Sequence, residues 1–217
     1  SWKITEGGGS QQILIGHRIP IFMTELTEFK KGFGGPLRPG ALVTVTDDGK
    51  DFPMLFLHLK AAGEPIDFGV RDEQHSKARS LRKALDSASP NPRSNFMVIG
   101  DLNNVGMDVT FDKTMDITEG QELTRLEAMY GSGHDRMDVV KKSHNVTFWN
   151  GPGSVDPPAN LDHVIAARTV TFDTANPADP PVQVLGWPRE ATPAAQGQWI
   201  RRFSDHAILR FKVSGGA

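Results

Sequence analysis

The chain has 217 residues, a length typical of one domain, and 38% of them are hydrophobic, so the chain can bury a sizeable core and is not disordered. Lys and Arg number 24 against 26 Asp and Glu, and the resulting net charge of −2 excludes a strongly basic nucleic-acid coat protein. The absence of cysteine excludes disulfides, thiolate zinc sites and cysteine nucleophiles, and no apolar run approaches the roughly 20 residues of a membrane span.

Short apolar runs bounded by turn residues predict β-strands. In chain order these runs are residues 12–16, 41–46, 54–59, 96–99 with Gly100, 146–149, 161–166 and 207–213. The sequence Asp47-Asp48-Gly49-Lys50 predicts a hairpin turn between the second and third strands. Every position from 96 to 99 is apolar, so we expect this strand to be buried on both faces.

Two helices are expected. Residues 67–87 carry Ala78, Leu81, Ala84 and Leu85 at helical spacing. Residues 118–129 open with a capping-box pattern, Thr118 followed three residues later by Gln121. The polar, proline-rich stretch 169–202 reads as a long surface connection. Many short strands with few helices indicate sheets packed on each other with helices outside.

Polar side chains suited to binding metals or carrying protons stand at the ends of four predicted strands. The segments are Leu57-His58-Leu59-Lys60, Ile99-Gly100-Asp101-Leu102-Asn103-Asn104, Asn160-Leu161-Asp162-His163 and Phe203-Ser204-Asp205-His206. Sites on rigid scaffolds form where such strand ends converge, so these segments are the candidate functional site.

Each segment has an ordinary structural reading as well. His58 alone is more often a structural histidine. Asp101 and Asn103 would face the same side of an extended segment and suit a hard cation and a phosphate oxygen, but the same pair is equally typical of an Asx-turn. His163 could simply cover a sheet edge, and Asp205 and His206 would point to opposite faces of a strand.

The ordered set is more specific than its members. It resembles the endonuclease/exonuclease/phosphatase superfamily of DNase I-like hydrolases through His58-Leu59-Lys60, Gly100-Asp101-Leu102-Asn103, Leu161-Asp162-His163 and Ser204-Asp205-His206. The resemblance runs from about residue 13 to residue 213. It implies a four-layer α/β sandwich in which two mostly antiparallel sheets are flanked by helices, and Mg²⁺-dependent hydrolysis of a phosphate ester, with Mn²⁺ as the alternative ion.

The resemblance also implies a role for each site residue. His206 would be the general base that activates water, and Asp162 would orient its imidazole. Asp205 and Asp101 would be metal ligands, and Asp101 could instead protonate the leaving oxygen. Asn103 would donate to a phosphate oxygen, and His58 would bind the phosphate or assist the leaving group.

One part of the family pattern is missing. Members usually begin with a strand bearing Asn, a helix, and a strand ending in a metal-binding Glu, and no such elements precede residue 13. We therefore expect residues 1–217 to be a single domain of this type that is incomplete at its N-terminal side. Because a divalent cation needs several oxygen ligands, this chain alone should bind the metal weakly.

Three functions stay open at this stage. The first is a phosphodiesterase or nuclease with His-activated water, whose partner would be a phosphoester substrate, nucleic acid among them. The second is a small-molecule or lipid phosphoesterase of the same fold. The third is a non-catalytic binding module that has lost its metal, against which the joint presence of five polar site residues argues: Asp101, Asn103, Asp162, Asp205 and His206. Neither the compartment nor the oligomeric state can be read from the sequence.

Overall fold

The computed structural model describes residues 1–6, 12–31, 37–89 and 93–216. Its centre is a six-stranded sheet in the order β3-β4-β5-β6-β8-β7. Only β5 and β6 pair in parallel, and the other neighbours pair antiparallel. These strands span Phe22–Leu26 (β3), Gly40–Asp47 (β4), Lys50–His58 (β5), Met97–Asp101 (β6), Met137–Val139 (β7) and Asp162–Ala167 (β8).

Three two-stranded ladders complete the β-structure. They pair Trp2–Ile4 (β1) with Leu14–Gly16 (β2), Thr171–Phe172 (β9) with Val213–Gly215 (β12), and Gln183–Leu185 (β10) with Ile208–Arg210 (β11). The α-helices are Pro65–Ala88 (α1), Glu119–Gly131 (α2) and Pro193–Arg202 (α3), and the short 3₁₀ helices are Thr27–Lys30 (η1), Lys113–Met115 (η2) and Trp187–Arg189 (η3). No helix in the described ranges is long and apolar enough to cross a membrane.

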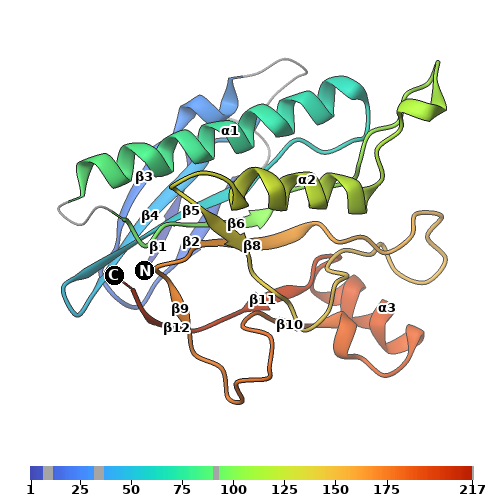
Figure 1. Cartoon of the computed structure of the whole chain (residues 1–217). Coiled ribbons are helices and arrows are strands. Elements are labelled where there is room, and N and C mark those ends of the chain that lie inside the picture. The colour runs from blue at the N-terminus through green and yellow to red at the C-terminus, as the bar shows by residue number, and fades with distance from the viewer. Residues whose placement is uncertain (7–11, 32–36, 90–92, 217) are drawn as a thin grey trace.

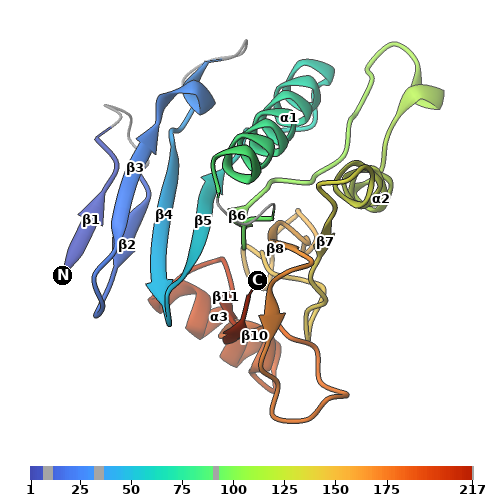
Figure 2. The ribbon, with the colours of Figure 1, turned by 60° about the vertical axis from the view of Figure 1, so that its left-hand side comes forward.

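The elements stack in layers around the central sheet. Figure 1 shows α1 and α2 on one face of the sheet, and the β9–β12 and β10–β11 ladders with α3 on the other. The β1–β2 hairpin lies beyond β3 at one edge (Figure 2), where the Glu6 amide donates to the carboxylate of Glu25. The chain is therefore a mixed α/β sandwich, as expected, with its second β-layer built from two short ladders.

Alternation along the central strands buries both faces of the sheet. On β5, Leu55 and Leu57 pack toward the helices, while Phe52 lies in the core on the opposite face. On β6, Val98 joins the helix-side core and Met97 the other. The expectation that residues 96–99 are buried on both faces is confirmed.

The helix α1 buries the face that its apolar residues predict, but polar side chains share that face. Ala78 is buried, Leu81 and Leu85 pack against the same core, and Ala84 is exposed. Several polar side chains of α1 are buried as well. These are Asp67, Arg71, Gln74, His75 and Arg82. They are hydrogen-bonded to loops and neighbouring elements, because buried polar groups need partners. The face of α1 is thus a set of anchor points for loops as well as part of the core.

Local signals at turns and caps are confirmed. Asp47 pairs with Lys50 across the hairpin, with Asp48 and Gly49 at positive φ. Thr118 and Gln121 form the reciprocal capping box at the start of α2.

Three other expectations need correction. The stretch 169–202 is not one surface connection, because it contains β9, β10, η3 and α3. Residues 146–149 form isolated bridges of Phe148 rather than a strand. The final apolar run divides into β11 and β12, which belong to different ladders.

Acid should destabilise the protein through His75. This ring is buried beneath Tyr130, and burial lowers its pKa from 6.5 to about 3. Unfolding exposes the ring to water, where it gains a proton below pH 6.5, so its contribution to stability is complete above pH 6.5 and is lost as the pH falls toward 3. At pH 5 the loss relative to pH 7 should be about 2 kcal/mol from this group.

Urea unfolding at pH 7 and pH 5 checks this value. In His75→Gln the difference in the free energy of unfolding between pH 7 and pH 5 should be smaller by about 2 kcal/mol, whatever the stability of the variant at pH 7. His134→Gln, at an exposed position, serves as the control and should keep the wild-type pH dependence. An unchanged pH dependence in His75→Gln would contradict the assignment.

Candidate active site

Strand register places three candidate residues in one row. His58 at the end of β5 pairs with Asp101 at the end of β6, and Asp101 pairs with Asp162 at the start of β8. Residues in register on adjacent strands point to the same face of a sheet. Because β5 and β6 are parallel and β8 is antiparallel to β6, two strands end and one begins at this edge. His206 reaches the row from the segment between α3 and β11.

His206 and Asp162 form a hydrogen-bonded pair at the centre of the site. Nδ1 of His206 lies 2.9 Å from Oδ2 of Asp162, while its Nε2 faces Oδ2 of Asp101 at 3.8 Å. Burial lowers the pKa of His206, but the hydrogen bond and charge of Asp162, helped by the charges of Asp101 and Asp205, outweigh it, so the net pKa is raised above 6.5. The ring of Phe148 packs against the imidazole at 5.0 Å between centroids. The carboxylate fixes Nδ1 as the protonated nitrogen and leaves Nε2 as the basic atom.

Asp101 lies between two histidines. Its Oδ2 is 3.2 Å from Nε2 of His58. Burial and the charge of Asp162 raise the pKa of Asp101 to about 6, against the opposing effects of His206, Asn103 and Arg38. Burial, together with the charges of Arg38 and His206, lowers the pKa of His58 to about 4. His58 is therefore neutral at pH 7, so its contact with Asp101 is that of a neutral ring and not an ion pair.

Asn103 is held by a turn, not by an extended strand. Its backbone amide donates to Oδ1 of Asp101 at 3.0 Å, its φ is 49°, and its side-chain amide donates to the carbonyl of Leu59 at 3.1 Å. The expectation of an extended segment with both side chains on one side is wrong here, and the Asx-turn alternative is right. The turn bends the chain after β6 back onto the end of β5.

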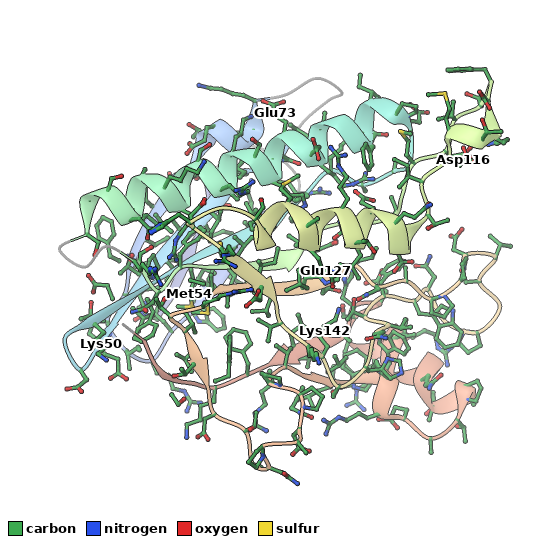
Figure 3. All side chains as sticks on the ribbon, viewed as in Figure 1. Lys50, Met54, Glu73, Asp116, Glu127 and Lys142 are labelled. Atoms are coloured by element: carbon green, nitrogen blue, oxygen red, sulfur yellow. The ribbon has the colours of Figure 1, made fainter. Side chains whose placement is uncertain are left out.

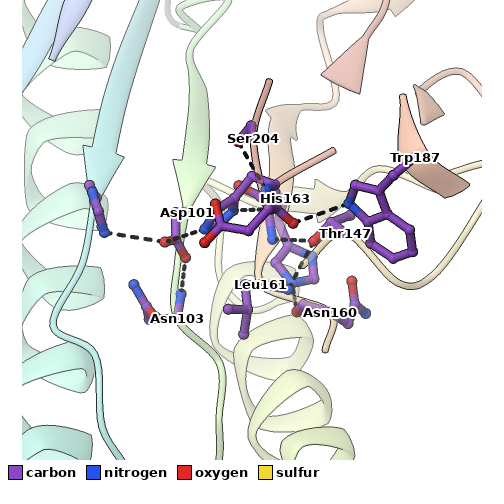
Figure 4. A network of polar contacts seen from close by, with 12 residues as sticks. Asp101, Asn103, Thr147, Asn160, Leu161, His163, Trp187 and Ser204 are labelled. Carbon is purple, nitrogen blue, oxygen red and sulfur yellow. Dashed lines mark hydrogen bonds and ion pairs between the residues drawn. The ribbon is translucent and has the colours of Figure 1, made fainter. Parts of the chain in front are cut away.

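The segment that carries Asp162 is fixed from several sides (Figure 4). The hydroxyl of Thr147 accepts the amide protons of Leu161 and Asp162. Lys142, labelled beside β8 in Figure 3, donates to the side chain of Asn160 and to the carbonyl of Asp162, each at 2.5 Å. Burial lowers the pKa of Lys142 to about 8, despite the nearby carboxylates.

His163 faces away from the site. It is buried, and its Nε2 lies 2.9 Å from the carbonyl of Asn160, so it supports the same segment from behind. This position fits the structural reading of His163, since neighbours on a strand point to opposite faces.

The segment 204–206 is also anchored through its backbone. Ser204 Oγ accepts the amide proton of His206, and the carbonyl of Asp205 accepts from the amide of Trp149 and from Nε1 of Trp187. The carboxylate of Asp205 accepts no hydrogen bond from the described residues. It stays available to a ligand beside His206.

The side chains of the site can be compared with the ligands that Mg²⁺ prefers in proteins. Within the described ranges, no group of three or more histidine and acidic side chains is arranged to hold an ion. Asp205 and Asp101 supply carboxylate oxygens, the donors that Mg²⁺ prefers, and Mg²⁺ sites often use one or two carboxylates with substrate phosphate oxygens and water. The donor chemistry therefore fits Mg²⁺, while the donor number predicts weak binding without substrate. The metal stays a prediction.

Comparison with solved structures gives the fold. A humanized form of TDP2 from D. rerio is 14% identical, with a TM-score of 0.58 over 99% of this chain and 77% of that chain. TDP2 from Caenorhabditis elegans is 12% identical, with a TM-score of 0.58 over 96% of this chain and 56% of that one. An endonuclease/exonuclease/phosphatase from Bacteroides vulgatus is 13% identical, with a TM-score of 0.50 over 82% and 55%.

The chain has the DNase I-like fold that these solved proteins share. It spans about half the length of the Bacteroides vulgatus and Caenorhabditis elegans proteins. Neither the family models nor the curated protein sequences give a match. The fold expected from the four ordered segments is confirmed, and it is these low-identity structures that confirm it.

Within this DNase I-like fold, the structure brings together His58, Asp101, Asp162 and His206, and places Asn103 and Asp205 next to them. Sequence reasoning missed Lys142 and Thr147, which stand in irregular backbone with no periodic signal. Asn160 had a signal, since it stands two residues before Asp162 in a segment already singled out.

Gly100 is the position at which a single methyl group should disturb the site most. Its φ is 140°, and a Cβ there would lie 2.0 Å from the carbonyl oxygen of Leu57. Gly100→Ala should lower the free energy of unfolding by about 3 kcal/mol or more, because a left-handed backbone costs about 1–2 kcal/mol and overpacking typically adds 1–3. Denaturant unfolding measures this loss.

Gly49→Ala is the matched control. Gly49 also has positive φ (71°), but a Cβ there would meet nothing within 4 Å. Gly49→Ala should lower the free energy of unfolding only by the cost of the left-handed backbone, about 1–2 kcal/mol. Equal losses for the two variants would contradict the close approach of β5 and β6 at Gly100.

Proposed function

We propose that this protein hydrolyses phosphate esters, and phosphodiesters in particular, by activating water with His206. The observation that carries the proposal is the His206–Asp162 pair, whose free nitrogen faces Asp101 across 3.8 Å. A histidine oriented by a carboxylate is suited to take a proton at neutral pH. The DNase I-like fold adds support, since solved proteins of this fold are described as endonuclease/exonuclease/phosphatase proteins.

The positions of these side chains support the following reaction. His206 Nε2 takes a proton from water as the water oxygen attacks phosphorus, and the bond from phosphorus to the leaving oxygen breaks. In its protonated form Asp101, whose pKa is raised to about 6, can give its proton to the leaving oxygen and then regain one from solvent, while His206 releases the proton taken from water. His58 lies on the other side of Asp101, with its Nε2 at 3.2 Å from Oδ2.

The charges favour a diester over a monoester. Asp101, Asp162 and Asp205 bring three carboxyl groups to the site, against which Arg38 and His206 are the basic groups that act on both Asp101 and His58. A phosphodiester carries one negative charge and a monoester nearly two at neutral pH, so the monoester is repelled more strongly. When Asp101 is ionised, a Mg²⁺ ion held by Asp205 and Asp101 would offset this repulsion and stabilise charge on the phosphate; Asp101 would then be a metal ligand instead of the acid.

Hydrolysis of an aryl phosphodiester, an aryl phosphomonoester and plasmid DNA tests the proposal, each with Mg²⁺, with Mn²⁺ and with EDTA. The diester should be cleaved faster than the monoester, and EDTA should abolish cleavage. Cleavage of plasmid DNA would identify a nuclease. An aryl monoester cleaved faster than the diester would contradict the charge argument.

Two variants test the residue roles. His206→Ala should lower kcat by about 10²–10⁴-fold, the usual contribution of a general base. Asp162→Asn should lower it by roughly 10–100-fold, because the ring keeps its place but loses its orienting charge. The exposed His134→Ala should have wild-type activity. Activity that survives His206→Ala would overturn the proposed mechanism, and binding without hydrolysis in every condition would favour a non-catalytic module.

A further inference from the structure

Arg71 and Glu122 form a buried ion pair beneath the loops that leave the site. Arg71 on α1 is 0% exposed, and Glu122 on α2 is 5% exposed. The guanidinium Nε and Nη2 donate to the two carboxylate oxygens at 2.8 and 3.1 Å. The pair joins the two helices that cover one face of the sheet.

All five guanidinium protons are used. Beyond Glu122, Arg71 donates to the backbone carbonyls of Lys60 at 3.3 Å, Ala62 at 2.6 Å and Gly106 at 2.7 Å. Glu122 in turn accepts the amide proton of Gly106 at 2.6 Å. The ion pair therefore binds both the carbonyl and the amide of Gly106.

The bound carbonyls belong to the two loops that carry the site. Lys60 and Ala62 follow His58 at the end of β5, and Gly106 follows Asp101 and Asn103 at the end of β6. The two loops are also joined to each other, since the amide of Asp108 donates to the carbonyl of Gly63 at 2.7 Å. A shift in either loop would move a residue of the site.

Both loops contain strained backbone. Ala62 has a φ of 83° and Asn103 a φ of 49°, values that L-residues other than glycine rarely adopt. Gly106 has a φ of 84°, and a Cβ there would lie 2.2 Å from the carbonyl oxygen of Ile117. At a residue other than glycine such a conformation persists only where surrounding contacts impose it. Arg71 bonds the carbonyl of the strained Ala62 and that of Gly106, a position where the backbone requires glycine.

We propose that Arg71 and Glu122 are positioning residues that hold these loops in their strained form, so that His58, Asp101 and Asn103 meet. A buried ion pair is a poor source of stability, since apolar residues of similar volume often stabilise a core equally well. Its value here is geometric, because an apolar pair could not bind three carbonyls and an amide. This role rests on the proposed phosphoesterase function, but the held geometry can be measured without activity.

Glu122→Gln is the test variant. The carboxamide offers one acceptor oxygen to the three N–H groups that Glu122 now accepts, two from Arg71 and one from Gly106. Asp86→Asn is the matched control, because Asp86 also binds a buried arginine of α1, Arg82, but at the opposite end of that helix. Both variants remove one carboxylate from a buried arginine.

Amide hydrogen exchange reads the loop geometry directly. In Glu122→Gln the amides of Leu59 and Asp108, which bond to Asp101 and Gly63, should exchange at least tenfold faster. The amide of Ala167, bonded to Phe96 at the other end of β8, should keep its protection. Uniformly faster exchange, or no change at Leu59 and Asp108, would overturn the proposal even if the wild type cleaves no phosphoester.

Steady-state kinetics test whether the ion pair affects catalysis at the site. Measured where both variants are fully folded, Glu122→Gln should lower kcat about tenfold and leave KM within twofold, whereas Asp86→Asn should leave both unchanged. An equal loss of kcat in both variants would show that the pair acts only through overall stability. An active wild type with unchanged kcat in Glu122→Gln would also overturn the positioning role.

Discussion

The site depends on the register of three strands. His58, Asp101 and Asp162 are direct pairing partners across β5, β6 and β8, so hydrogen bonds between backbones set the spacing of their side chains. A shift of one residue would turn any of them to the opposite face, into one of the two apolar cores. The cores that stabilise the sheet therefore also fix which side chains reach its edge. His206 is the one member of the group that must come from elsewhere, and backbone bonds at Ser204 and Asp205 bring it there.

The same register brings like charges together. Asp101 and Asp162 are neighbours in the row, and burial together with the charge of Asp162 raises the pKa of Asp101. The two carboxyl groups differ in their contacts. Asp162 is paired with Nδ1 of His206 at 2.9 Å, whereas Asp101 faces Nε2 of that ring and carries the raised pKa. A carboxyl group with a raised pKa beside a histidine is typical of acid–base sites.

Much of the fold and the centre of the site could be predicted from the sequence, since period-two alternation and strand-end motifs are local signals. The burial of polar residues on α1 could not, because Arg71 and Gln74 look like solvent-exposed residues until loop carbonyls surround them. The sequence around Asn103 is compatible with two conformations. In the fold, the bond from its amide to Asp101 forms the turn, and the carbonyl of Leu59 holds its side chain there. The helix α3 had a signal in Thr192 and Pro193, an N-cap and first-turn pair, but its polar surroundings concealed it.

The polar face of α1 links these observations. A helix with an apolar inner face would pack on the sheet in several closely similar positions, since dispersion contacts are not directional. Arg71, Gln74 and Arg82 instead bond to specific carbonyls, which fixes the position of the helix along the sheet. The parallel crossover from β5 to β6 passes through this helix, so its position sets both loops that leave the site. Polar residues in this core therefore contribute precision at the sheet edge, where small displacements matter for proton transfer, more than they contribute stability.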